Sequence, residues 1–485
     1  MRYYIALIIL GLILLSLSGC QSPSHKSENT SLRSSLNGIW QSNGYGYLLD
    51  IQPNDVRFYD ITEERCQYNE EGSTLFSKLA AGEISDAVFK LKKTDRDTLI
   101  YIEPFETYPI EFMRLGNMPH RCLASVQNDP KTNFEFFADY MQTHYAFFKL
   151  YGVDWQKTVH EAKSQVDNNM SDVELFNLFS SMLKPLKDAH LALIGDVDGQ
   201  TKRFQPDHST VSKANAELAK QQGTSHRSMN KTFFKQYKKD IRDTILKNKG
   251  EVAANGWIQY GVIDLNNDKQ AIGYLALMST YNYAGAGVGH DIEDRSILMS
   301  VLDDAIDEFN EQKVKAVIID LSVNVGGYSF PAIDLANRFA AQQQLVFYKL
   351  AYDARDQNFF PEYVAPEKRS PESQFHGPVY LLSANTTVSG GEEVVLALRA
   401  LPNVTHFGEN TRGALSDILT KTLPNGWTLD LSNEIYIDFA GNLWEGDGIP
   451  PDYYLQVFDP KNPFDGHVEA VDQVIHLINN YLQNT

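Results

Sequence analysis

Cysteine is scarce in this chain, with three residues among 485. Three thiols cannot build a disulfide framework or a four-thiolate zinc site, and no HExxH motif occurs, so we expect no metal and no other cofactor. Positive charge is also in the minority, because 43 lysines and arginines face 62 aspartates and glutamates, for a net charge of −19. Binding to nucleic acid is therefore not expected, since phosphate recognition needs clustered positive charge.

The apolar run at residues 5–15 is too short for a membrane-spanning helix, but it suits the core of a signal peptide. It ends in residues 17–20 (LSGC), which resemble the bacterial lipobox, where the cysteine is lipidated and becomes the new N-terminus. We expect a signal peptide over residues 1–19, a lipid on Cys20 and a polar tether over residues 20–36. An ordinary secretory signal with a chance cysteine is the alternative.

These features predict an exported protein that is anchored in the bacterial cell envelope. Gln21, where some lipoproteins have aspartate, favours the outer membrane facing the periplasm if the organism is Gram-negative. The compartment would be oxidising, so we expect a disulfide between Cys66 and Cys122, with two buried free thiols as the alternative.

Length and composition favour a globular protein of about three domains, with 43% hydrophobic and 22% charged residues. Residues 37–126 contain short alternating runs and turn signals, which predict a small β domain that serves either as a ligand-binding barrel or as a packing module. Residues 130–195 are helical in pattern, with a capping box at residues 171–174 (SDVE) and a helix end near Pro185.

The second half of the chain has a different pattern. Residues 196–255 are rich in Lys, Asn and Gln, and we expect a helical insertion there. From residue 256 to residue 485 strands and helices alternate, as in an α/β domain.

Ser389 is the strongest catalytic candidate, because a strand, a Gly-flanked turn and an apolar helix place it at a helix N-terminus. Free N–H groups and the helix dipole favour developing negative charge at such a position. The backbone N–H of Gly390, together with that of Gly326 or Gly327, could form an oxyanion hole. A plain N-cap serine is the alternative. A nearby base is also required, and His190 lies between a helix end and a strand, where its side chain could point into a cleft.

Five ordered motifs now join these candidates. They are residues 186–190 (LKDAH), 317–327 (VIIDLSVNVGG), 387–392 (TVSGGE), 408–413 (GENTRG) and 445–452 (EGDGIPPD). Together they resemble the tail-specific (C-terminal-processing) serine peptidases. One branch of that family uses a Ser–Lys pair, but Ala414 stands at the lysine position, so the resemblance points to the tricorn-like branch.

The resemblance implies a crotonase/Clp-like α/β peptidase core, with Ser389 as nucleophile, His190 as general base and Glu445 as the acidic residue that supports the base. The expected activity is endopeptidase or oligopeptidase hydrolysis of a peptide or protein substrate through an acyl-enzyme. Ala189 and Ser322 depart from the family pattern, which motivates an alternative: a non-catalytic peptide- or glycan-binding surface lipoprotein on a decayed peptidase core.

Overall fold

The computed structural model describes residues 35–84, 90–103, 109–265, 270–287, 289–352, 360–364 and 374–483. The predicted signal peptide and Cys20 lie outside the described residues. The chain forms two compact units. The first comprises Met1–Asp207, Leu350–Phe360 and Ser416–Ile435, and the second comprises His208–Lys349, Pro361–Leu415 and Tyr436–Thr485.

The first unit begins with a seven-stranded antiparallel sheet in the order β4-β3-β2-β1-β7-β6-β5. Its strands are β1 (Gly38–Ser42), β2 (Tyr47–Gln52), β3 (Asp55–Ile61), β4 (Cys66–Asn69), β5 (Lys90–Lys93), β6 (Thr98–Ile102) and β7 (Ile110–Leu115). Helix α3 (Glu70–Ala80) contributes Phe76 to the same apolar core as Trp40 and Phe112. The predicted N-terminal β domain is therefore confirmed.

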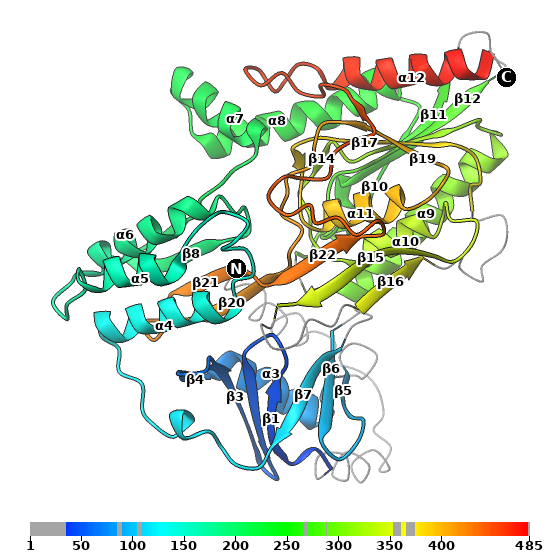
Figure 1. The fold of residues 1–485 in the computed structure, drawn as a ribbon. Helices are drawn as coiled ribbons and strands as arrows, with labels where there is room; N and C mark the ends of the chain where they lie inside the picture. Colours follow the sequence, from blue (N-terminus) through cyan, green and yellow to red (C-terminus); the bar gives the residue numbers. More distant parts are fainter. Residues whose placement is uncertain are drawn as a thin grey trace. The chain divides into compact units, whose positions relative to one another are not determined.

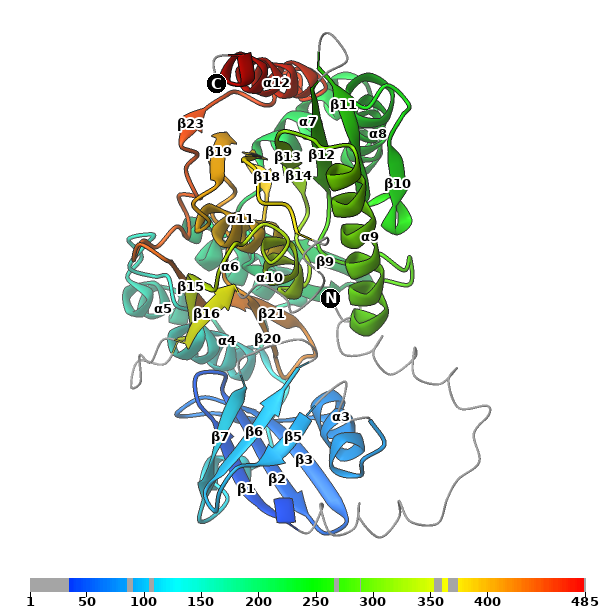
Figure 2. The same ribbon diagram turned by 90° about the vertical axis from the view of Figure 1, so that its right-hand side faces the viewer.

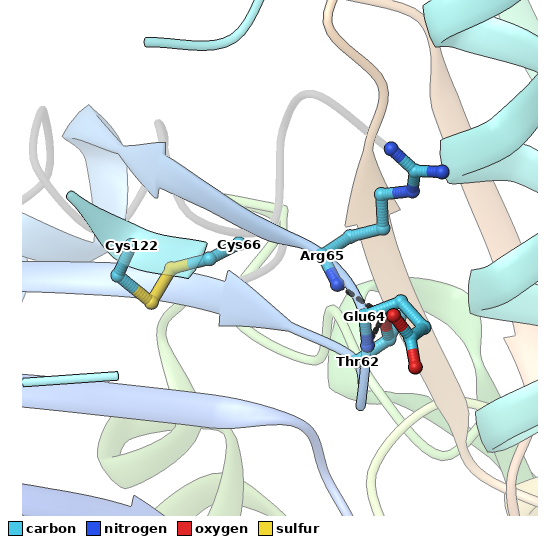
Figure 3. The surroundings of a disulfide bond; sticks show 5 residues. All are labelled: Thr62, Glu64, Arg65, Cys66 and Cys122. Atoms are coloured by element: carbon cyan, nitrogen blue, oxygen red, sulfur yellow. Dashed lines mark hydrogen bonds between the residues drawn. A yellow bond between two sulfur atoms is a disulfide. The ribbon is translucent and has the colours of Figure 1, made fainter. Parts of the chain in front are cut away.

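A disulfide joins Cys66, the first residue of β4, to Cys122, the last residue of the short helix η1 (His120–Cys122) (Figure 3). Beside it, the Thr62 hydroxyl accepts hydrogen bonds from the backbone N–H groups of Glu64 and Arg65 and so closes the turn that enters β4. The cross-link ties the segment that leaves the β domain to the edge of its sheet.

The rest of the first unit combines three helices with a four-stranded sheet. The helices are α4 (Pro130–His144), α5 (Trp155–Lys163) and α6 (Asp172–Leu183), followed by η2 (Lys184–Leu186). The sheet runs β20-β21-β8-β9, with β8 (Ala192–Val197), β9 (Gln200–Phe204), β20 (Ile418–Thr422) and β21 (Thr428–Ser432). The capping box of Ser171 and Glu174 forms as predicted, and α6 ends just before Pro185 because proline disfavours helix in the preceding residue.

The second unit is built on the sheet β10-β11-β12-β13-β17-β19-β23, which is antiparallel from β10 to β12 and parallel from β12 to β23. Its strands are β10 (Glu251–Ala253), β11 (Ile258–Asp264), β12 (Ala271–Leu277), β13 (Val317–Asp320), β17 (Val379–Ser383), β19 (Val404–Gly408) and β23 (Tyr453–Tyr454). The predicted mixed α/β fold class is confirmed.

Helices cover both faces of this sheet (Figure 1). Helix α8 (His226–Asp240), which follows α7 (Thr210–Gln221), and helix α12 (His467–Gln483) share one apolar core with alternate residues of β12, such as Tyr274. On the other face, α9 (Asp291–Glu311) places Phe309 where a side chain at Gly273 would otherwise lie. Helices α10 (Phe330–Ala336) and α11 (Gly390–Arg399) lie with α9 on that side.

Shorter elements complete the described structure. Strands β14 (Val323–Asn324) and β18 (Thr386–Thr387) form a small parallel pair in the second unit, whereas β15 (Gln344–Ala351), β16 (Phe360–Val364) and β22 (Glu434–Asp438) span unit boundaries along the chain. Two further turns are the π-helix η3 (Ile241–Ile245) and the 3₁₀ turn η4 (Ala254–Gly256). No helix in the described ranges is long and apolar enough to cross a membrane.

The segment expected as a helical insertion, residues 196–255, is only partly helical. Helices α7 and α8 do form, but residues 196–204 finish β8 and make β9. The backbone of β9 pairs with β8, with Leu193 opposite Phe204, so cross-strand hydrogen bonds determine this conformation although the local sequence is polar.

Candidate active site

Ser389 lies at the junction between β18 and α11. The segment just before Ser389 is fixed by residues 321–324, because the Val388 N–H donates to the carbonyl of Asn324 in β14 (3.1 Å) and the Thr387 hydroxyl donates to the carbonyl of Leu321 (2.7 Å). Ser389 is partly exposed, whereas Gly390, Gly391 and Glu392, which follow it, are buried. Ser389 is the residue just before α11, so it lies at the N-terminus of a helix as predicted.

The backbone of Ser389 adopts φ 57° and ψ −129°, a conformation that non-glycine residues rarely occupy. Such a conformation costs free energy, so the surrounding structure must hold it. The Ser389 N–H donates to the carbonyl of Ala414 at 3.0 Å and to Glu392 Oε2 at 3.2 Å. Two acceptors therefore fix the serine in this conformation.

Glu392 is fully buried in the first turn of α11 and accepts four hydrogen bonds. Its Oε1 accepts from the Thr411 hydroxyl (2.5 Å) and the Gly413 N–H (2.7 Å), and its Oε2 accepts from the N–H groups of Ala414 (2.8 Å) and Ser389. Burial raises the pKa of this carboxyl, although the hydrogen bonds oppose the shift. One carboxylate thus connects the backbone of Ser389 to residues 411–414.

Two of the glycines predicted to form an oxyanion hole, Gly326 and Gly390, lie beside Ser389. A Cβ at Gly326, where φ is +74°, would lie 2.6 Å from the Cβ of Ser389. A Cβ at Gly390 would lie 2.5 Å from the Thr280 hydroxyl, so only glycine fits at either position without displacing a neighbour. The Gly326 N–H donates to Asn324 Oδ1 at 2.9 Å, so Gly327 and Gly390 become the better candidates for oxyanion donors.

Glu445 is attached to the same segment as Ser389. Its side chain is 2% exposed, and its Oε2 accepts from the N–H of Leu415 at 2.9 Å. The next residue, Gly446, donates to the carbonyl of Gly413 at 2.8 Å. Residues 413–415 therefore contact both Ser389 and Glu445 within the second unit.

His190 belongs to the first unit and lies between η2 and β8. The loop is organised by the buried Asp188, whose Oδ1 accepts from the N–H groups of His190 (2.8 Å) and Leu191 (3.1 Å). Asp188 Oδ2 accepts from the hydroxyl of Tyr145 at 2.9 Å. The His190 side chain is 7% exposed.

A serine and a histidine in direct contact occur at another place in the second unit. Ser383 Oγ lies 2.7 Å from His406 Nε2, but both residues are fully buried. Burial lowers the pKa of His406 to about 3, so this ring stays neutral at physiological pH. With no exposed surface and a hydroxyl that donates to the carbonyl of Glu409, this pair fills a structural role.

Sequence reasoning did not assign roles to Glu392, Asn324 or Asp188. Glu392 lies three residues after Ser389 in the motif at residues 387–392, and this closeness could have indicated its role. Asp188 and Asn324 also lie in motifs, but nothing else in the sequence indicated what they do. Within the ranges that the structure describes, no group of three or more His, Cys, Asp and Glu side chains is placed to hold a metal ion.

Comparison with known proteins identifies a peptidase domain within this architecture. Residues 272–455 match the model of peptidase family S41, so the chain carries an S41 peptidase domain. The predicted family and enzyme class are confirmed.

Two solved structures illustrate the likeness. A protein from Parabacteroides merdae ATCC 43184 classed as a peptidase is 25% identical, with 72% of this chain and 97% of that chain covered and a TM-score of 0.55. Mature CPAF complexed with lactacystin is 12% identical, with 74% and 99% covered and a TM-score of 0.51, and it shows the shared fold.

Proposed function

We propose that this chain hydrolyses peptide bonds of a peptide or protein substrate through an acyl-enzyme on Ser389. His190 acts as the general base, and Glu445 orients the histidine and stabilises its charged form. The backbone N–H groups of Gly390 and Gly327 stabilise the oxyanion. The activity is that of an endopeptidase or oligopeptidase.

The reaction proceeds in two halves. His190 takes the proton of the Ser389 hydroxyl as Oγ bonds to the carbonyl carbon, and the oxyanion forms. The histidine then gives this proton to the amine nitrogen, the peptide bond breaks and the acyl-enzyme remains. In the second half, His190 takes a proton from water, hydroxide bonds to the ester carbonyl carbon, and the proton returns to Ser389 Oγ as the acid leaves.

The observation that carries this proposal is the backbone of Ser389. A partly exposed serine is held at φ 57° by two hydrogen bonds beside Gly326 and Gly390, neither of which has room for a side chain. Strained backbone that neighbouring groups hold in place is typical of catalytic positions, whereas a plain N-cap serine adopts ordinary extended backbone. The S41 domain favours this function over the non-catalytic alternative.

The test is active-site labelling of the purified chain with a fluorophosphonate, mapped by mass spectrometry. We expect one modified serine, Ser389, and loss of both labelling and peptide cleavage in Ser389→Ala. A Ser181→Ala variant, which removes a hydroxyl that donates to the carbonyl of Leu178 in α6, is the matched control and should keep both. Equal cleavage of a peptide mixture by folded Ser389→Ala and wild-type protein would refute the proposal.

We further propose that Cys20 carries a lipid that anchors the enzyme in the bacterial envelope, on the outer membrane facing the periplasm if the cell is Gram-negative. The lipobox at residues 17–20 and the polar tether after it support this location. Cys20→Ser should abolish incorporation of radiolabelled fatty acid and shift the protein from the detergent phase to the aqueous phase. Retention of label in that variant would contradict the anchor.

A further inference from the structure

Charge is distributed unevenly along this acidic chain. Residues 208–249 hold ten lysines and arginines but three acidic residues, whereas the whole chain has a net charge of −19. No aspartate or glutamate occurs between His226 and Lys239, which make up nearly all of α8. Seven of these ten basic residues lie on α7 and α8, two helices that lie together in both views (Figures 1 and 2).

One face of α8 carries a basic stripe made of Arg227, Lys231, Lys235 and Lys239. These residues recur at every fourth position, and all four side chains are exposed. Positions four apart are neighbours on a helix surface, so the stripe runs for about 18 Å along the axis at a rise of about 1.5 Å per residue. The stripe is a continuous row of charge.

The opposite face of α8 is fixed in the core. Met229, Phe233 and Tyr237 also recur at every fourth position and are between 3% and 4% exposed. The helix cannot turn its apolar face outward without unfolding this part of the core, so the basic stripe faces outward permanently. Its arrangement is determined by the fold.

Few acidic groups neutralise the stripe. Lys239 lies 3.2 Å from Asp243, which also pairs with Arg242 at 2.6 Å. Arg227, Lys231 and Lys235 have no ion pair with any residue in the described ranges. Three like charges in a row with no internal partner repel one another and favour an anionic partner.

We propose that the basic stripe of α8 docks onto a membrane surface that carries anionic phospholipid headgroups. The inference rests on the proposed function only through the lipid anchor at Cys20, which would hold the stripe near such a surface. A tethered domain has a high effective concentration at the membrane, so a weak electrostatic contact is sufficient. Clusters of four or more lysines and arginines on one helix face are typical of this recognition.

The composition of the stripe favours lipid headgroups over an acidic polypeptide. Three of the four residues are lysines, whose point charge suits a diffuse negative potential, whereas bidentate carboxylate recognition favours arginine. No large hydrophobic side chain of α8 is exposed, so the helix offers no apolar anchor for a peptide. The same absence means that the helix lies on the headgroups and does not insert into the acyl chains.

The test is sedimentation of the chain from residue 21, which keeps every described element, with vesicles of phosphatidylcholine and phosphatidylglycerol at 3:1. We expect binding at low salt, none to pure phosphatidylcholine and none at 1 M salt, where the screening length falls to about 3 Å. The triple variant Arg227→Gln/Lys231→Gln/Lys235→Gln should bind about 100-fold more weakly, since each basic residue contributes about fivefold.

The matched control is Lys131→Gln/Lys157→Gln/Lys163→Gln, which removes the same charge from exposed positions on α4 and α5. This control should bind as wild type does, and both variants should hydrolyse a soluble peptide at the wild-type rate. Equal weakening by the two triple variants, equal binding to neutral and anionic vesicles, or binding of polyglutamate but not of vesicles would each overturn the proposal. Vesicle binding by Ser389→Ala separates this result from failure of the proposed catalysis.

Discussion

The carboxylate of Glu392 accepts a hydrogen bond from the backbone N–H of Ser389 at 3.2 Å and holds residues 411–414 with its other three hydrogen bonds. The residue that precedes α11 and the loop that follows β19 are therefore fixed to one another. We infer that Glu392 positions the serine, because the strained backbone conformation needs such support.

Glu392→Gln should lower kcat by about 10- to 100-fold with little change in KM. Glutamine has the same shape as glutamate, but its NH₂ group cannot accept hydrogen bonds from the N–H donors that it would face. The variant also loses the negative charge, and each hydrogen bond to a charged group contributes about 1.5–3 kcal/mol. Steady-state kinetics on a soluble peptide would measure this. Glu393→Gln alters an adjacent buried carboxylate that accepts from Ser329 Oγ, and it should keep most activity. Equal losses in both variants would contradict a positioning role.

The raised pKa of Glu392 predicts a specific pH dependence of stability. Because the folded state holds this proton more tightly than the unfolded state does, the free energy of unfolding should fall as pH rises from the ordinary glutamate pKa of 4.5 towards the raised value. Glu392→Gln should remove this component. Urea unfolding at several pH values would check it, and an unchanged slope in the variant would argue against the raised pKa.

Gly326→Ala should strongly reduce activity while the protein stays folded. The added Cβ would lie 2.6 Å from the Cβ of Ser389, and the φ of +74° is unfavourable for alanine by about 1–2 kcal/mol. Gly152→Ala is the control, since that residue also has positive φ (+65°) but open space around it. The rate of fluorophosphonate labelling should fall in Gly326→Ala but not in Gly152→Ala. An equal fall in both variants would exclude the steric explanation.

His190→Ala should reduce kcat by about 10²- to 10⁴-fold, which is the usual contribution of a general base. His160→Ala, an exposed histidine on α5, should have no effect. Stopped-flow measurement of acylation would show the slower proton transfer in the first variant. An unaltered acylation rate in folded His190→Ala would remove His190 from the mechanism.

The Cys66–Cys122 disulfide should stabilise the first unit. It closes a loop with a sequence separation of 56 residues, and the chain-entropy relation gives about 4 kcal/mol for a loop of this length. Cys66→Ser/Cys122→Ser should lower the unfolding temperature, and a reductant should then have no further effect on the variant. A variant that unfolds at the wild-type temperature would show that the bond adds no stability.

Local signals in the sequence were sufficient for several elements. The capping box at Ser171 and the proline after α6 determine the limits of that helix, because the groups that form them are within a few residues of one another. The position of Ser389 before a helix also followed from the local pattern of strand, glycines and apolar helix. The motifs, taken in order, predicted the family and the enzyme class.

The support of the nucleophile could not be predicted in this way. The four donors to Glu392 come from residues up to 22 positions away, and no periodic pattern relates them to it. The burial of Ser383 and His406 also depends on the interior positions of β17 and β19 in the seven-stranded sheet. A sequence shows that serines and histidines are present but not which of them are buried.

The sequence by itself determined the class of enzyme, the candidate nucleophile and base, and the cysteines available for pairing, because these depend on residue type and local spacing. Only the tertiary structure decided that Glu392 fixes Ser389, that Asn324 engages the N–H of Gly326, and that the basic stripe of α8 faces outward. The physical reason is that hydrogen-bond partners and burial arise from contacts between segments distant in the chain, which local propensity does not encode.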